Sequence, residues 1–244
     1  MTVSSAREEI LGDVKRALHR DEKDPARSDV ASVSSRLEDV VSEIRSSCGQ
    51  RQSKLIEQFE SEAARIGVHF RRATNVEVAV QYIVDLSSGR DARRVVSWDA
   101  QVIIDMGLRE KLQERGVEFL IETTDAEFIK KAATADIGVS GVDYALADTA
   151  TLVLLARKGQ ARSVSLLPPI HVAVVTPEQI LSGLSDLFPL LRADANAEDR
   201  DLSSAITFIT GPSRTADIEL TLVVGVHGPQ ELHVLLLEPT TDQV

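Results

Sequence analysis

The chain has 244 residues, of which 43% are hydrophobic and 27% are charged, and it carries a formal net charge of −11. This length allows a sizeable core, whereas the acidic balance argues against nucleic acid as a partner, because binding a polyphosphate needs a basic surface. The single cysteine, Cys48, excludes an intramolecular disulfide and cannot hold an iron–sulfur cluster, which typically needs about four thiolates.

The amino-terminal part predicts two helical stretches and a linker. Apolar residues recur at helical spacing over residues 3–19, and the polar run at 20–35 that follows has no such periodicity. A second helical stretch covers residues 36–66, and Cys48 and its neighbours are expected to break it in two.

Strands and helices alternate in the next part of the chain. The expected strands cover residues 68–73, 93–98, 117–122 and 135–141, and the expected helices cover 75–89, 99–116 and 125–133. This alternation is typical of an α/β domain with an open, mainly parallel sheet and helices on both faces. We therefore expect a helical arm and linker at 1–50 and an α/β domain at 51–240.

The second half of the chain contains stronger apolar runs. Residues 149–156 and 163–175 predict a hairpin that continues past two prolines into a buried strand. A helix is expected at 176–194, and closing strands are expected at 204–210, 219–226 and 231–237. No apolar stretch approaches the roughly 20 residues of a membrane-spanning helix, and the first residues lack the apolar core of a secretory signal. We therefore expect a cytoplasmic protein without a membrane span.

The loop "TGPSRTADIE" is the strongest local candidate for a binding site. Ser213 and Thr215 offer hydroxyl groups, and Arg214 offers a guanidinium that suits a carboxylate or a phosphate. Asp217 and Glu219 follow as candidate catalytic acids or bases. The alternative, which the sequence favours equally, is that Arg214 pairs with one of these two acids in a turn that has no further role.

Two aspartates lie near the start of the apolar run at 149–156. Asp148 is a third candidate for acid or base chemistry, and Asp143 precedes it by five residues. The alternative interpretation, a helix cap or a turn, is favoured for both in the absence of other information.

A basic segment and two polar residues come next. Arg157, Lys158 and Arg162 form either an anion-attracting loop or a solvated hairpin tip. Ser165 and His171 are expected to line a pocket beside the following strand, and we treat them with Arg162 as candidate ligand-binding residues. No Gly-x-Ser-x-Gly motif supports a nucleophilic serine.

The five histidines predict no metal site. They are scattered along the chain and show none of the pair spacings that metal sites favour. His227 and His233 flank a turn, and a structural pair is favoured over a zinc site.

Three stretches of the chain are distinctive: "GVSGVDYALADTATLVL", "RSVSLLPPIHVAVV" and "GPSRTADIELTLVVGVHGPQELHVLLL". Together they resemble the LUD-domain family, and most closely its lactate-utilisation protein C branch. The resemblance covers about residues 50–238. It implies a fold similar to that of sugar-phosphate isomerases, coenzyme A transferases and formyltetrahydrofolate cyclo-ligase.

The resemblance also implies a function and partners. It points to a cluster-free subunit of an iron–sulfur complex that oxidises L-lactate to pyruvate, with no cofactor in this chain and iron–sulfur clusters in partner subunits. In this hypothesis Arg214 holds a small anionic ligand, Ser213 orients it, and Asp217 or Asp148 tunes protonation.

One segment departs from the family pattern. The family usually has Glu-Thr-Gly where this chain has Asp148, Thr149 and Ala150. Because alanine tolerates positive φ poorly, this change puts the role of the loop in doubt. By contrast, the residues that follow the pattern are Arg162, Ser165, Pro168, His171 and the segment 211–219.

Two other hypotheses stay open. In the first, the chain is a stand-alone enzyme that acts on a phosphorylated or acyl small molecule, such as a coenzyme A ester or a folate-like compound. Alternatively, it is a regulatory or scaffold protein whose helix at 3–19 docks on another subunit.

Overall fold

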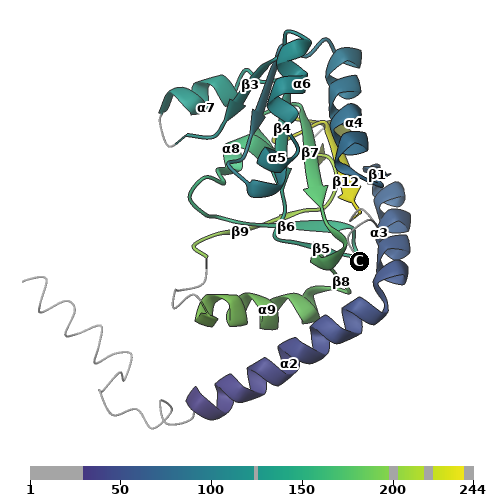
Figure 1. The fold of residues 1–244 in the computed structure, drawn as a ribbon, viewed down its shortest axis with the longest axis vertical. Coiled ribbons are helices and arrows are strands. Elements are labelled where there is room, and N and C mark those ends of the chain that lie inside the picture. The colour runs from purple at the N-terminus through teal and green to yellow at the C-terminus, as the bar shows by residue number, and fades with distance from the viewer. Residues whose placement is uncertain (1–29, 124–125, 198–202, 217–221, 239–244) are drawn as a thin grey trace, which may run out of the picture. The chain divides into compact units, whose positions relative to one another are not determined.

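The computed structural model describes residues 30–123, 126–197, 203–216 and 222–238 (Figure 1). The chain divides into two compact units, Met1–Glu43 and Ile44–Val244.

In the first unit, the described residues belong to helix α2 (Val30–Gln50). The helix expected at 3–19 lies outside the described residues. Residues 30–35 were expected to be part of a linker, but they are helical. No proline or glycine occurs between positions 26 and 48, so nothing in the sequence stops the helix from starting there.

The second unit is built on a parallel sheet of six strands in the order β1-β12-β7-β4-β2-β3. All neighbouring strands in it are parallel. The strands are β1 (His69–Ala73), β2 (Arg94–Ser97), β3 (Glu118–Ile121), β4 (Ile137–Gly141), β7 (Ile170–Val175) and β12 (Glu231–Leu237). This sheet confirms the predicted α/β fold class.

Helices cover both faces of this sheet (Figure 1). They are α3 (Gln52–Ile66), α4 (Val76–Gly89), α5 (Gln101–Asp105), α6 (Leu108–Glu114), α7 (Ala126–Ala132) and α8 (Arg162–Leu166). Phe59 of α3 packs on Phe70 of β1, whereas Tyr82 of α4 reaches His233 of β12. Phe70 and His233 point to opposite faces, because they are one position apart in the parallel register. Helices α3 and α4 therefore lie on opposite sides of the sheet.

The remaining elements form two smaller sheets and two helical segments. A four-stranded sheet has the order β8-β5-β6-β9, and a hairpin pairs β10 with β11. These elements are β5 (Tyr144–Leu146), β6 (Thr151–Leu155), η2 (Pro177–Gln179), β8 (Ile180–Leu181), α9 (Leu184–Ala197), β9 (Ile206–Ile209), β10 (Arg214–Ala216) and β11 (Leu222–Val224).

The hairpin predicted from residues 149–156 and 163–175 is wrong. Strand β6 pairs with β5 and β9, whereas β7 lies in the six-stranded sheet, and α8 separates the two strands. A close approach of backbones makes this arrangement possible: a Cβ at Gly138 of β4 would clash with the carbonyl oxygen of Val164 in α8. Glycine at position 138 therefore lets α8 pack on the sheet.

Two predicted helices are interrupted. The helix expected at 176–194 is divided into η2, β8 and α9, because Ile180 and Leu181 pair with the edge of β5. The helix expected at 99–116 is divided into α5 and α6 at Gly107, whose φ of 62° is left-handed.

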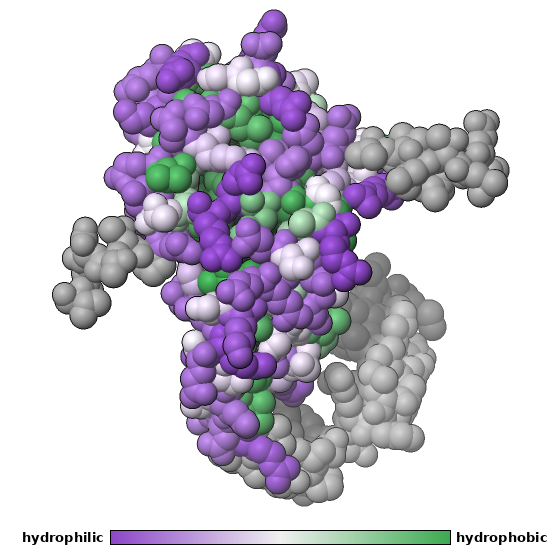
Figure 2. Space-filling model, turned by 90° about the vertical axis from the view of Figure 1, so that its right-hand side faces the viewer, coloured by the Kyte–Doolittle hydropathy of each residue, from purple (hydrophilic) through white to green (hydrophobic). Residues whose placement is uncertain are grey.

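The core lies between the central strands and the helices around them. Every residue of β4 and of β7 is buried. On the face shown in Figure 2, hydrophilic residues predominate and hydrophobic residues show only in small areas between them. Within the described ranges, no helix combines the length and the apolar character needed to cross a membrane.

Candidate functional site

The strand order creates a switch point between β2 and β4. After β2 the chain continues to β3 on one side, and after β4 it continues to β7 on the other side. Loops therefore leave the carboxyl ends of these neighbouring strands in opposite directions. Open α/β sheets bind their ligands in the crevice that forms at such a point.

A cavity of about 370 Å³ lies at this switch point. Its walls come from the segments after β2 and β4, from the loop after β6, and from two residues nearer the carboxyl end of the chain. The lining residues are Trp98, Ala100, Val102, Gly141, Val142, Asp143, Tyr144, Arg157, Gln160, Gln179 and Asp194. The volume is within the range that small-molecule sites occupy, roughly 300–1,000 Å³.

An ion pair between Asp143 and Arg157 is the central polar feature of the cavity. The Asp143 carboxylate also accepts a 2.7 Å hydrogen bond from the backbone nitrogen of Leu155. Its side chain is 7% exposed, whereas that of Arg157 is 39% exposed. Burial raises the pKa of Asp143, although both partners oppose this effect. Because Arg157 is the more exposed partner, it can turn toward a bound anion while Asp143 stays in place.

Tyr144 supplies a neutral hydroxyl group to the cavity. It donates a 2.5 Å hydrogen bond to Asp194, whose other carboxylate oxygen lies 3.8 Å from Arg45. Burial, followed by this hydrogen bond, raises the pKa of Tyr144 above its ordinary value. The hydroxyl therefore stays protonated at neutral pH.

Two glutamines complete the polar lining. The Gln179 side chain is held at both ends, since its oxygen accepts from the nitrogen of Thr176 at 2.8 Å and its amide group donates to the carbonyl of Val142 at 2.6 Å. The side-chain oxygen of Gln160 is buried and has no hydrogen-bond partner in the described part of the chain. Because that oxygen exposes almost no surface, the Gln160 side chain has to turn before its oxygen can accept a hydrogen bond from a ligand hydroxyl in the cavity.

Residues 156–161, here called the Arg157 loop, are anchored at several points. Trp98 donates its ring N–H to the carbonyl of Ala161 at 3.0 Å, and the Ala161 nitrogen donates to the Glu122 carboxylate. The nitrogen of Asp99 donates to the carbonyl of Gly159 at 3.1 Å. The anchors on the sheet side, Trp98, Asp99 and Glu122, follow the carboxyl ends of β2 and β3, so the sheet itself positions the loop.

A second cavity, of about 250 Å³, lies beside this loop. It is lined by Asp99, Glu122, Thr123, Lys158 and Gly159. Burial and the nearby charge of Asp99 raise the pKa of Glu122, while the hydrogen bond from the Arg157 loop opposes the increase. Carboxyl groups with raised pKa values therefore lie at both cavities, Asp143 at the larger one and Glu122 at the smaller one.

The structure places the loop favoured by the sequence away from both cavities. Arg214 is exposed and donates a 2.7 Å hydrogen bond to the carbonyl of Ile66, at the carboxyl end of α3. It therefore satisfies one of the carbonyls that a helix end leaves without a partner. Ser213 makes backbone hydrogen bonds to Pro229 and Gly225, and Thr215 pairs with β11. Asp217 and Glu219 lie outside the described residues.

Ser165 and His171 lie in the core and line neither of the two cavities described above. Ser165 is buried and donates to the carbonyl of Arg162 at 3.2 Å. His171 is fully buried, and its Nε2 lies 2.8 Å from the hydroxyl of Ser140. Burial lowers the pKa of His171 to about 3. Arg162 is exposed at the start of α8, and none of the three lines either cavity.

Asp148 lies in the turn between β5 and β6. It is exposed, its carboxylate accepts from the Thr149 hydroxyl at 3.1 Å, and its nitrogen donates to the carbonyl of Ser182 at 3.1 Å. Ala150 is buried with a φ of 49°. The turn therefore holds an alanine in the left-handed region, at a cost of roughly 1–2 kcal/mol.

The sequence reasoning missed most of the cavity. Asp143 and Arg157 were both noted, but not as a pair, and Trp98, Tyr144 and Gln160 were not singled out. The available signal was a polar or aromatic residue directly after an apolar strand, as in "VVSWD" and "GVSGVDY".

Comparisons with known proteins give a consistent result. The LUD domain family model matches residues 56–237. A protein of Halalkalibacterium halodurans named Lactate utilization protein C is 38% identical over 167 residues, which cover 68% of this chain and 72% of the relative. A protein of the same name from Shouchella clausii is 32% identical over 178 residues, which cover 72% of this chain and 76% of the relative.

A solved structure has a similar fold. It is a DUF162 family protein from Deinococcus radiodurans, with a TM-score of 0.51 and 20% identity. The match covers 76% of this chain and 98% of that protein. At this level of identity the similarity shows the fold alone.

Proposed function

The chain belongs to the LUD domain family, and from this premise we propose that it is a component of a system that oxidises L-lactate to pyruvate. The relatives named Lactate utilization protein C, up to 38% identical, support a role in lactate utilisation. In this proposal the chain holds no iron–sulfur cluster, and iron–sulfur partner proteins accept the two electrons that lactate releases.

The environment of the only cysteine supports this division of labour. Cys48 is buried, and its Sγ lies 3.9 Å from the carboxylate of Asp186. Burial raises the pKa of the thiol, which disfavours the thiolate that a metal or cluster would need. One such thiol is also too few for a cluster with about four cysteine ligands.

The observation that carries the site assignment is the pair of Asp143 and Arg157 in the switch-point cavity. A guanidinium forms paired hydrogen bonds with a carboxylate, so Arg157 suits the carboxylate of lactate or pyruvate. The Gln160 oxygen, which has no partner among the described residues, suits the hydroxyl group that distinguishes lactate from pyruvate once the side chain turns toward the cavity. The cavity thus offers a partner for each polar group of a 2-hydroxy acid.

Growth on L-lactate tests the function in cells. Deletion of the gene should abolish growth on L-lactate and leave growth on pyruvate unchanged, and the wild-type gene should restore it. Arg157→Gln should fail to restore growth, whereas Arg214→Gln, a matched change of an exposed arginine, should restore it. Undiminished lactate oxidation in the deletion strain would contradict the proposal.

Affinity purification tests the partners. A tagged chain from lactate-grown cells should bring down proteins that contain iron and acid-labile sulfide, and the same chain purified alone should contain neither. Iron and sulfide bound to the isolated chain would refute the cluster-free assignment.

A further inference from the structure

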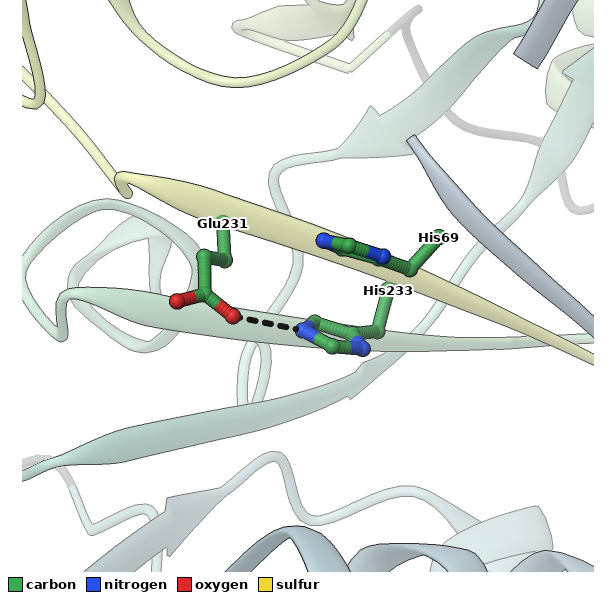
Figure 3. A group of neighbouring side chains, drawn as sticks. All are labelled: His69, Glu231 and His233. Atoms are coloured by element: carbon green, nitrogen blue, oxygen red, sulfur yellow. Dashed lines mark hydrogen bonds and ion pairs between the residues drawn. The ribbon is translucent and has the colours of Figure 1, made fainter. Parts of the chain in front are cut away.

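Three side chains of types that commonly bind metals meet at the amino ends of β1 and β12. The switch-point cavity lies at the other end of the sheet, beyond the carboxyl ends of β2 and β4. His69 stands beside His233 in the parallel register, and Glu231 precedes His233 by two residues on the same strand. Side chains two apart on a strand share a face, as do paired residues of neighbouring strands. All three therefore project from one face of the sheet (Figure 3).

The donor atoms are already close together. One ligand atom from each residue lies within 4.8 Å of the others, and His233 Nε2 is 3.2 Å from a Glu231 carboxylate oxygen. A divalent ion with bonds of about 2.0–2.2 Å holds neighbouring donors roughly 3–3.5 Å apart. Glu231 and His233 meet this spacing without movement.

His69 is the ligand that has to adjust. Its ring stacks on that of His233, with centroids 4.5 Å apart and planes 21° apart (Figure 3). Because metal binds in the plane of an imidazole, the ring must turn about its side-chain bonds to share an ion with His233. His69 is exposed, so it has the space to turn.

Neighbouring residues hold the other two ligands in place. The hydroxyl of Tyr82 lies 2.8 Å from His233 Nδ1. In the metal-free chain, the 3.2 Å contact between His233 Nε2 and Glu231 is a hydrogen bond when Nε2 carries the ring proton. A metal ion would take the place of that proton on Nε2, and the ring would then carry its proton on Nδ1 and donate it to the Tyr82 hydroxyl. Arg90 lies 2.8 Å from both carboxylate oxygens of Glu231, so it orients the carboxylate, and metal binding has to draw one oxygen away from it. Such outer partners commonly orient metal ligands.

We propose that His69, Glu231 and His233 bind a divalent transition metal ion of the zinc type. Two imidazoles and one carboxylate suit zinc and its neighbours better than calcium or magnesium, which prefer oxygen ligands alone. Three protein ligands leave a tetrahedral ion at least one position for water, on the side of the exposed His69. This replaces the expectation from sequence that the chain has no metal site.

Bound metal would also join β1, the edge strand, to β12. The ion links a residue from near the start of the domain to two from near its end, so it binds the folded chain and not the unfolded one. Metal should therefore raise the unfolding temperature.

Titration of the full chain with Zn²⁺ alone, and separately with Co²⁺ alone, tests the proposal after removal of metals with a chelator. We expect saturable binding of one ion, a visible absorption band for Co²⁺, and a rise in unfolding temperature. His69→Gln and Glu231→Gln should each weaken binding at least about tenfold. His227→Gln, a matched change of an exposed histidine outside the cluster, should bind like the wild type.

Tyr82→Phe provides a second test, because it keeps all three ligands. It should weaken binding by about 10- to 100-fold if the hydroxyl orients His233. The proposal is overturned if the wild type shows no saturable binding of either ion, or if His69→Gln and Glu231→Gln bind as it does. Metal affinity and unfolding temperature are both measured independently of lactate oxidation.

Discussion

Arg157 and Arg214 lie in two short polar segments that look alike in the sequence, but the structure places Arg157 in a loop and Arg214 at the start of β10, where they make very different contacts. Arg157 pairs with the buried carboxylate of Asp143 at the wall of a cavity. Arg214 is exposed and donates to the carbonyl of Ile66 at the end of a helix. The first arginine can exchange its partner for a ligand, whereas the second fills a structural role that every helix end creates.

The difference between the two segments comes from the sheet beneath them. The Arg157 loop lies over the carboxyl ends of β2, β3 and β4, where the strand order opens a crevice. Residues 211–213 lead into β10, which pairs with β11 in a separate two-stranded sheet near the end of α3. Whether an arginine side chain is available to a ligand therefore depends on where the fold places it. The residues next to it in the sequence are a poor guide to this.

Gly138→Ala should have the largest effect, because α8 packs directly against this glycine. Helix α8 directly follows the Arg157 loop. The added methyl group would clash with the carbonyl of Val164, and we expect a loss of about 3 kcal/mol in unfolding free energy. Chemical denaturation measures this loss. Gly89→Ala is the matched control: a Cβ there meets nothing within 4 Å, so stability should stay the same or rise by up to about 1 kcal/mol. Equal stability of the two variants would contradict the packing described here.

Arg157→Gln should destabilise the protein by about 2 kcal/mol at neutral pH, because it leaves the Asp143 carboxylate buried without its cation. The loss should shrink in acid. Without Arg157 the folded-state pKa of Asp143 rises further above its unfolded value, so protonation favours the folded state and the cost appears only as pH rises. Denaturation at pH 5 and pH 8 measures the difference. A loss that is equal at both pH values would argue against an unpaired carboxylate.

His171→Gln should change the pH dependence of stability, because His171 lies in the core. Its pKa is about 3 when folded and 6.5 in its ordinary state. The unfolded chain therefore binds the extra proton between these values, and the wild type should lose roughly 1 kcal/mol of stability for each pH unit of acidification in that range. The variant should show a correspondingly flatter slope. An unchanged slope would mean that His171 is accessible to water.

Arg214→Ala should have the smallest effect. It removes one hydrogen bond to a helix carbonyl that water can replace, so we expect a loss of at most about 1 kcal/mol. Thermal unfolding measures the loss. A severe loss of stability would show that Arg214 supports more than the end of α3.

The alternation of strands and helices from residue 68 to residue 141 was predictable from the sequence. Most of the elements expected there appear, although the helix expected at 99–116 is divided at Gly107. Asn75 caps α4 by accepting a hydrogen bond from the nitrogen of Val78. The second half was less predictable, since local periodicity does not tell which sheet a strand joins. Strands β6 and β7 are similar apolar runs, but they belong to different sheets.

The candidate site was only partly predictable. Asp143 and Arg157 meet because β5 and β6 pair as a hairpin, with Tyr144 opposite Val153. The turn of that hairpin contains Ala150 with positive φ, a position where glycine would have signalled the turn. Because this position holds alanine, neither the turn nor the proximity of Asp143 and Arg157 was predictable from the sequence.

Calorimetric titration of the purified chain with L-lactate tests the central claim most directly, with wild type, Arg157→Gln and Arg214→Gln measured side by side. The account predicts saturable binding by the wild type, an affinity at least about tenfold weaker for Arg157→Gln, and no change for Arg214→Gln. Binding that survives in Arg157→Gln but is lost in Arg214→Gln would contradict it and return the site to the loop at 211–216.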